Sequence, residues 1–453
     1  MTKFAFTHEW LAAGNDAPEF LHTTANLALH VGDVNLMQNE DSWSKTIRES
    51  VLVSAYPVAM WLASSWWRLN WEPRPAQGVR PAVDWRMAHE LGASNHGFVW
   101  PQIIFASDGE VMQVWSVASS ANGRQSVRYL NGLETPISIA LADFRRGAED
   151  FIVAVLDRLD AMQCQDTDLS RLWRLIQDNR ADQASAQYRR LEAEMGYDPD
   201  ECPDPLISKA LRLEQDMGAA ALSELTPVYG KSATQEPLTG IEDIVAIAAS
   251  RGLRGAPTDP RSLQTVSPCQ HAPWQCAVEA AREVRDALGN KHGLIDNAML
   301  YDLLGLTASA VDRWSAPTPR PGAAIAISDT DNHYKFVPRK RHPLAKRFEL
   351  ARFLGDYLLP QQTRGSWLAS TDLATARQKY QKAFAAELLC PIGALKGVLE
   401  NDYSESAIED AAHHFQVSLR TVESLLSNNG LVSFPLGFED TEVRLPYPLT
   451  YEA

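Results

Sequence analysis

The chain has 453 residues, a length typical of about three domains. Hydrophobic residues make up 45% of it, which is enough for packed cores and excludes an intrinsically disordered chain. The net charge of −15 argues against broad binding to nucleic acid or to acidic membranes. Five cysteines without a CxxC pair, and no signal peptide, lead us to expect a reduced, cytoplasmic protein.

Residues 1–150 contain nine of the 13 tryptophans and are expected to form a small α+β domain. Apolar spacing in the first half predicts mainly helices. Alternating apolar runs predict three strands further on, at 102–106, 111–117 and 126–130. Nothing in this domain identifies a ligand.

The most apolar stretch, at 51–67, is about as short as a membrane-spanning helix can be. Pro57 interrupts it, and its aromatic side chains are crowded. We therefore predict a buried helix here and no membrane association.

Tryptophans in and after this stretch are interleaved with arginines, a pattern that can form a stacking platform for single-stranded nucleic acid. The residues concerned are Trp61, Trp66, Trp67, Trp71, Arg68, Arg74 and Arg80. Because the tryptophans lie within an apolar helix of an acidic chain, packing in a core is the favoured interpretation.

His89 begins the letters HELG, and His96 follows seven residues later. A zinc-binding HExxH helix needs a second histidine four residues after the first, but that position is Ala93. Gly92 and its polar neighbours also form a poor helix. A metal site on His89 and His96 is therefore the weaker interpretation.

Residues 151–229 have apolar positions at helical spacing and dense charge of both signs, which predicts a helical spacer or interaction region. Residues 226–239 are rich in Pro, Gly, Ser and Thr and predict a linker to the next domain.

Cys269, His271 and Cys276 place three potential zinc ligands within eight residues. Their spacing is not that of a standard zinc motif, and no second Cys/His pair lies close by in sequence. A plain loop and helix start is the favoured interpretation.

The most basic run of the chain follows two predicted strands, at 322–328 and 334–337. Its members are Lys335, Arg339, Lys340, Arg341, Lys346 and Arg347. Such a cluster could bind an acidic protein partner or a nucleic-acid backbone. A solvated or structural role is the alternative, and we favour it.

Residues 346–360 are predicted to form one helix, because apolar side chains recur at three- and four-residue spacing between flanking prolines. Residues 382–391 are predicted to form part of the following helix. Arg352 and Asp356 lie one turn apart on the first helix, so we expect them to form an ion pair.

The segments RFELARFLGDYLL at 347–359 and AFAAELLCP at 383–391 resemble two successive helices of the ImmA/IrrE family of metallopeptidases. Flanking segments at 273–289 and 408–432 resemble the family's opening and closing helices. This likeness implies a zincin-like domain with a small sheet over residues 240–432. Together with the preceding regions it makes the expected fold class α+β and mostly helical.

The resemblance also implies where a metal would be bound, and there the family pattern is broken. The two histidines and the glutamate of the metal-binding helix are replaced by Arg352, Asp356 and Phe353 in the segment Arg352-Phe353-Leu354-Gly355-Asp356. The acidic third ligand is also missing, since the corresponding positions are Gln378, Tyr380 and Gln381. An arginine repels zinc and a phenylalanine cannot transfer a proton. We therefore expect no metal, no cofactor and no peptidase activity by the standard route.

Residues 408–432 have the rhythm of a helix-turn-helix, with Arg420 as the side chain that could contact DNA. Glu423 offsets its charge, so a role within the fold is favoured over DNA binding. Residues 433–453 are expected to form a tail on the surface.

Members of the family commonly serve bacterial mobile elements, stress responses, toxin–antitoxin pairs and phage defence, and the resemblance implies such a setting here. With the ligand set lost, we expect a non-catalytic regulator or adaptor that binds a protein partner. Two alternatives remain open. One is a peptidase or other hydrolase with a non-standard site, and the other is a transcription regulator that binds DNA through 408–432.

Overall fold

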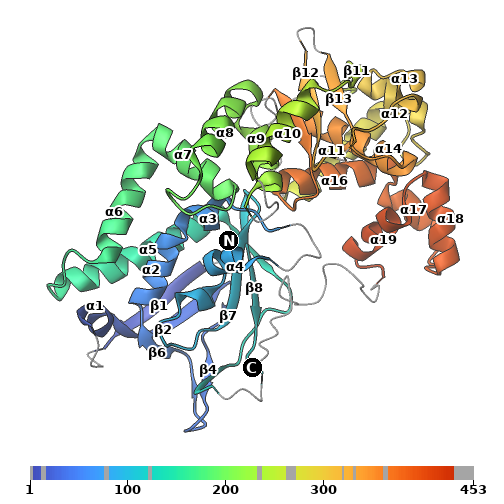
Figure 1. The fold of residues 1–453 in the computed structure, drawn as a ribbon. Coiled ribbons are helices and arrows are strands. Elements are labelled where there is room, and N and C mark those ends of the chain that lie inside the picture. Colours follow the sequence, from blue (N-terminus) through green and yellow to red (C-terminus); the bar gives the residue numbers. More distant parts are fainter. Residues whose placement is uncertain are drawn as a thin grey trace. The chain divides into compact units, whose positions relative to one another are not determined.

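The computed structural model describes residues 4–11, 17–75, 81–120, 125–231, 237–261, 272–318, 321–329, 333–360 and 366–432. They form an α+β fold of many helices and small antiparallel sheets (Figure 1). The chain divides into two compact units. As far as they are described, unit 1 holds residues 4–207 and 230–231, and unit 2 holds 208–229 and 237–432.

Unit 1 contains three small sheets. The first consists of β1 (Phe4–Trp10), β2 (Thr24–Val31), β3 (Val34–Asn35) and β6 (Val51–Ser54). The second consists of β7 (Gln102–Ser107), β8 (Val111–Val117) and β10 (Ile137–Ala140). The third consists of β4 (Asn39–Asp41), β5 (Ile47–Arg48) and β9 (Val127–Tyr129). All neighbouring strands run antiparallel, and the strands predicted around 102–130 are confirmed.

The helices of unit 1 complete a core with these sheets. They are α1 (Pro18–His22), α2 (Tyr56–Ser64), α3 (Trp66–Trp71), α4 (Val83–His89), the 3-10 turn η1 (Leu91–Ser94), α5 (Leu141–Ala161), α6 (Asp168–Ala181) and α7 (Gln183–Glu194). Helix α5 packs on β1, and the Phe6 and Phe151 rings stack 4.2 Å apart. Gly147 allows this approach, because a Cβ there would lie 2.5 Å from the carbonyl oxygen of Phe4.

The first half of unit 1 differs from the mainly helical pattern expected for it. Strands β1, β2 and β6 occupy positions where helices were predicted, because alternating and helical apolar spacing are hard to distinguish in short runs. The stretch 51–67 accordingly begins as strand β6 and becomes helical only from Tyr56. Among the described residues, no helix combines the length and the apolar character needed to cross a membrane.

The tryptophan-rich segment packs in the core, as favoured from the sequence. Trp61, Trp66 and Trp67 are buried in the hydrophobic cluster of unit 1. Arg68 is also buried and pairs with carboxylates rather than facing solvent. A stacking platform for nucleic acid is therefore not formed by these residues, and Arg80 lies outside the described residues.

Unit 2 is built around one four-stranded antiparallel sheet with the spatial order β11, β13, β12, β14. These strands are β11 (Leu253–Gly255), β12 (Ala324–Ser328), β13 (Tyr334–Val337) and β14 (Trp367–Ser370). The predicted pairing of 322–328 with 334–337 is confirmed by the β12–β13 register, in which Ile325 faces Val337.

The other described elements of unit 2 are helical. They are α9 (Ala219–Leu225), the 3-10 turn η2 (Thr226–Tyr229), α10 (Pro237–Ala249), α11 (Pro273–Ala287), α12 (Asn297–Leu304), α13 (Ala308–Asp312), α14 (Pro343–Tyr357), α16 (Ala376–Leu389), α17 (Ile392–Leu399), α18 (Glu405–Phe415) and α19 (Leu419–Asn428). Helix α16 packs against both α11 and α14. The helices predicted at 346–360 and 382–391 lie within or around α14 and α16, and this helix pair positions the candidate site.

The region 151–229, expected to be a helical spacer or interaction region, is shared between the two units. Helices α5, α6 and α7 contribute Phe151, Trp173 and Ala193, respectively, to the core of unit 1. The division falls within α8 (Asp204–Met217), and α9 packs against β14 of unit 2. The apolar faces of these helices are thus parts of two larger cores.

Candidate functional site

The positions that the sequence resemblance would assign to a zinc site meet where α14, α16 and β14 come together. Arg352 and Asp356 are one turn apart on α14, and Gln378 and Gln381 share a face of α16. Thr375 fixes the start of α16 by accepting a hydrogen bond from the Gln378 backbone at 3.2 Å. The sequence spacing therefore does bring these four polar positions into one buried region.

Arg352 is held by oxygen atoms that carry no full charge. One of its terminal nitrogens donates to the Thr371 carbonyl at 2.8 Å, to Gln381 Oε1 at 3.3 Å and to Gln378 Oε1. Gln378 and Gln381 in turn donate to the Ala369 carbonyl at 3.0 and 2.9 Å. The amide side chains thus connect α14 to β14 through a closed set of hydrogen bonds.

Burial lowers the pKa of Arg352 to about 10, which still leaves the guanidinium charged at neutral pH. The side chain is only 4% exposed, so a buried cation lies at the position where the resemblance would place the first histidine. Phe353, at the position of the catalytic glutamate, is fully buried beside Phe336 with the ring centres 5.6 Å apart.

Asp356 pairs with Arg377, and not with Arg352 as expected from the sequence. Its two carboxylate oxygens accept hydrogen bonds from Arg377 Nε at 2.7 Å and Nη2 at 2.9 Å. The Ala369 backbone also donates to it at 3.3 Å. An arginine that approaches from another helix can present this two-pronged geometry, which is stronger than a single contact along one helix face.

Glu224 extends the same network from α9, far away in the sequence. Both of its oxygens lie within hydrogen-bonding distance of Thr375 Oγ1, at 2.9 and 2.7 Å. Burial raises the pKa of Glu224, although Arg377 and Thr375 act in the opposite direction. Burial by itself would lower the pKa of Arg377, but Asp356 outweighs it and the pKa is raised.

Arg377 and Glu224 were missed by the sequence analysis. The available signal was a charged residue inside an otherwise apolar helix, AAALSEL in the case of Glu224. Tyr380, one of the candidate ligand positions, instead lies in the hydrophobic core, where burial raises its pKa to about 12.

The basic run before α14 is largely used within the fold. Arg339 is 2% exposed and binds Glu349 Oε1 at 3.1 Å and Asp372 Oδ1 at 2.6 Å. Burial alone would raise the pKa of Asp372, but Arg339 holds it at about 2. Arg347 is 3% exposed and donates to Asn297 Oδ1 at 2.8 Å.

The other cations of the run are also engaged, to different degrees. Lys335 donates to the Ala248 carbonyl, Lys346 donates to the Val311 carbonyl at 3.0 Å, and Lys340 lies 3.7 Å from Asp372. Arg341 is exposed and donates to Thr318 Oγ1 at 2.9 Å. The run is therefore not a free basic surface, and the hypothesis that Arg339 and Arg347 contact a partner is corrected by their burial.

His89 is fully buried in unit 1 and has both ring nitrogens engaged. Nδ1 lies 2.8 Å from the Phe105 carbonyl oxygen, and Nε2 lies 3.0 Å from Glu72 Oε2. The Trp85 ring stacks on the imidazole at 4.0 Å. Glu72 also accepts a hydrogen bond from Arg68 Nε at 2.8 Å. Burial would raise the pKa of Glu72, yet His89 and Arg68 lower it.

The candidate metal ligands that the structure describes, His89, His96 and Cys276, do not form a metal site. The His96 ring packs 5.3 Å from Phe20, away from the partners of His89. Cys276 is disulfide-bonded and has no thiolate to offer to zinc, which differs from the expectation that the cysteines are reduced. Cys269 and His271 lie outside the described residues. Within the described part of the chain, no group of three or more His, Cys, Asp or Glu residues could hold a metal ion.

The helix-turn-helix-like segment is confirmed as two packed helices, α18 and α19, joined through Gln416 in a left-handed conformation. Val422 and Leu426 of α19 are buried in the core of unit 2. Exposed Glu409 and Asp410 lie on α18. Arg420 is exposed, but these acidic neighbours in the motif do not favour DNA. The tail at 433–453 lies outside the described residues.

No family model, no curated protein and no solved structure matches the chain.

Proposed function

We propose that unit 2 is a metallopeptidase-like scaffold without catalytic activity, and that the chain acts as a regulator or adaptor that binds a protein partner. The setting that fits the sequence resemblance is a bacterial mobile-element, stress-response, toxin–antitoxin or phage-defence system. One observation carries the proposal. Arg352, Gln378 and Gln381 fill the positions of a metal site with a buried, hydrogen-bonded cation.

The contacts made by these buried charged groups support a structural role for them rather than a catalytic one. A buried guanidinium that repels metal, together with the Asp356–Arg377 pair, gives these positions a structural role. Buried charged side chains in folded proteins generally have their hydrogen bonds satisfied, and most of the hydrogen-bonding groups of Arg352, Asp356 and Arg377 are satisfied here. A scaffold of this kind can present its surface to a partner while no bond is cleaved.

A gain-of-site experiment tests the metallopeptidase-like arrangement. The purified chain should contain no stoichiometric zinc, whereas the triple variant Arg352→His, Asp356→His, Gln378→Glu should bind about one zinc per chain. Elemental analysis after dialysis against zinc measures this, and circular dichroism verifies folding. A folded triple variant without zinc would contradict the zincin-like arrangement. Chelator-sensitive cleavage of a partner by the unmodified chain would contradict the loss of catalysis.

The β4–β5 hairpin of unit 1 offers a surface through which a partner could be bound. Trp43 is 97% exposed and Ile47 is 66% exposed on this hairpin. Exposed tryptophans are frequent among the residues that dominate binding energy in protein interfaces. The hairpin therefore supports the proposal of a protein partner independently of the polar network in unit 2.

Affinity purification from the native host tests this contact. A partner recovered with the unmodified chain should be lost, or recovered about tenfold less, with Trp43→Ser. The matched control is Leu175→Ser on α6, where the side chain is 49% exposed, and it should retain the partner. Equal recovery with both variants would exclude the hairpin as the contact.

A further inference from the structure

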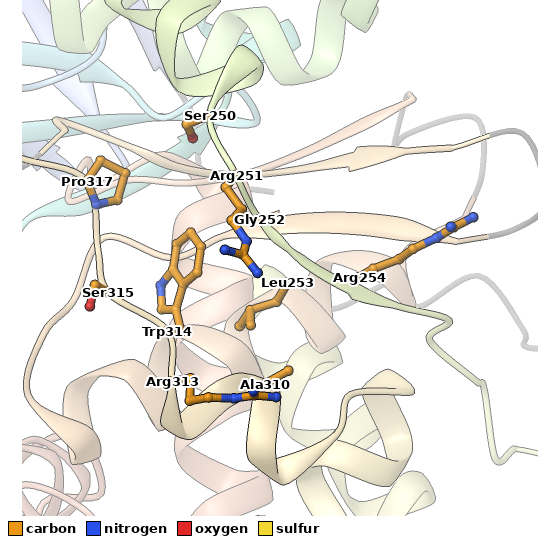
Figure 2. Close-up of a pocket in the computed structure, with 10 residues that line it drawn as sticks. All are labelled: Ser250, Arg251, Gly252, Leu253, Arg254, Ala310, Arg313, Trp314, Ser315 and Pro317. Atoms are coloured by element: carbon orange, nitrogen blue, oxygen red, sulfur yellow. The ribbon is translucent and has the colours of Figure 1, made fainter.

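A pocket of about 580 Å³ opens in unit 2 beside the edge strand β11 (Figure 2). One side is formed by the segment from Ser250 to Arg254 and the other by Ala310 and the segment from Arg313 to Pro317. Its size is in the range of pockets that bind small organic molecules. None of the residues of the degenerate metal site lines it.

The lining of the pocket is cationic, although the chain as a whole has a net charge of −15. Arg251, Arg254 and Arg313 contribute to it, and the lining contains no Asp or Glu. Arg254 is partly neutralised by Asp329, at 3.3 Å between largely exposed side chains. Arg313 donates to the Ser309 carbonyl at 2.8 Å through Nε. Among the described residues, neither Arg251 nor Arg313 makes an ion pair, so two guanidinium charges remain for a ligand.

The apolar part of the lining lies next to these cations. Figure 2 shows the Arg251 side chain beside the Trp314 ring and above Leu253, whereas Arg254 extends away from them. Arg313 runs past Ala310 at the opposite side of the pocket. Leu253 is buried and Trp314 is partly exposed, so the pocket combines a planar aromatic wall with two guanidinium groups that make no ion pair with any described residue.

We infer that this pocket binds a nucleoside phosphate, with the phosphate held by Arg251 and Arg313 and the base packed on Trp314. A phosphate monoester carries nearly two negative charges, which matches two guanidinium groups better than a single carboxylate does. Indole rings stack on bases of any sequence. The hydroxyl groups of Ser250 and Ser315 lie in the same lining and can bond to sugar or base atoms. This inference does not depend on the proposed loss of peptidase function.

Calorimetric titration of the full chain with adenosine, guanosine, cytidine and uridine monophosphates tests the inference. At least one nucleotide should bind about tenfold more tightly than its free nucleoside or inorganic phosphate. Arg251→Gln and Arg313→Gln should each weaken nucleotide binding by about tenfold. Trp314→Leu should weaken the nucleotide and leave inorganic phosphate unchanged. Arg254→Gln is the matched control and should change nucleotide affinity by less than about twofold, because its side chain points away and is paired.

Three outcomes would overturn the inference. The first is the absence of binding by all these nucleotides. The second is equal affinity for nucleotide and inorganic phosphate, which would make the pocket a simple anion site. The third is nucleotide binding that Arg251→Gln and Arg313→Gln leave unchanged, since the ligand would then lie elsewhere. The melting temperature of each variant, measured without ligand, identifies any substitution that unfolds the chain.

Discussion

At the residue scale, Arg352 and Asp356 of α14 are buried in different ways. Asp356 is fully buried and depends on the charge of Arg377, whereas Arg352 contacts only neutral oxygens. Arg352 Nε and the nearby Ser370 hydroxyl are buried without a hydrogen-bond partner. The two positions should therefore respond differently to substitution. Loss of the Asp356 charge leaves the buried Arg377 cation unpaired, whereas loss of Arg352 leaves only neutral oxygen atoms unpaired, and an unpaired buried charge costs more free energy.

We predict that Asp356→Asn destabilises the chain by about 3 kcal/mol, because it leaves the buried Arg377 charge without its two-pronged partner. Arg352→Met should cost less, about 1–2 kcal/mol, because it leaves only neutral acceptors unsatisfied. Urea unfolding monitored for unit 2 measures both free energies. A larger loss for Arg352→Met would mean that the cation is better stabilised than its contacts indicate.

Glu224 leads to a prediction about pH. Because burial raises its pKa above the ordinary value of 4.5, the folded chain holds this proton more tightly than the unfolded chain does. The stabilisation that this proton provides is fully present when the pH is below 4.5. It is lost as the pH rises through the raised pKa of Glu224 in the folded chain. Glu224→Gln removes this titration, so the melting temperature of the variant should rise relative to that of the unmodified chain as the pH increases above 4.5. A difference that does not change with pH would show that Glu224 stays ionised in the fold.

At the scale of elements, the contact between α14 and α16 depends on a glycine. A Cβ at Gly355 would lie 2.7 Å from Cδ1 of Phe384, a ring that is itself fully buried. Helix propensity alone would favour alanine at this position by about 1 kcal/mol. Close packing therefore outweighs propensity at this position.

We predict opposite effects for the same substitution at two helical glycines. Gly355→Ala should destabilise unit 2 by about 1–3 kcal/mol through overpacking against Phe384. Gly397→Ala in α17 should be neutral or stabilise by up to about 1 kcal/mol, because a Cβ there would meet no neighbour within 4 Å. Free energies of unfolding in urea test the pair. Stabilisation of both variants would contradict the prediction, because it would show that α16 can shift to accommodate the added Cβ at little cost in free energy.

Some elements could be predicted from the sequence and others could not. Helix α14 has apolar side chains at helical spacing and begins at a proline, so its position was predictable, whereas α16 was expected from the sequence resemblance. Strands β1, β2 and β6 were missed because short apolar runs fit both helical and strand spacing. Helices α5 to α7 were recognised, but their membership of the unit 1 core was not, because an amphipathic face does not specify what it packs against.

At the scale of the whole molecule, each unit has its own hydrophobic cluster. We predict two unfolding transitions in calorimetry. Leu29→Ala and Leu350→Ala, at fully buried positions of units 1 and 2, should each cost about 2–5 kcal/mol. Each should lower the melting temperature of one transition only, and hydrogen exchange identifies which unit has opened. A single transition lowered equally by both variants would mean that the units unfold together.

The sequence by itself determined which residue types stand at the positions that the resemblance would assign to a metal site. An arginine and a phenylalanine, Arg352 and Phe353, are not among the side chains that bind zinc or act as a general base in such sites, so residue identity alone supported that expectation. Only the tertiary structure decided which groups pair. Glu224 and Thr375 are separated by 151 residues, and Arg377 reaches Asp356 from another helix. Burial of Arg339 and the assembly of the pocket around Trp314 also depend on segments that meet only after folding. Ion pairs and pockets depend on distances through space, and local sequence spacing fixes these distances only within a single helix or strand.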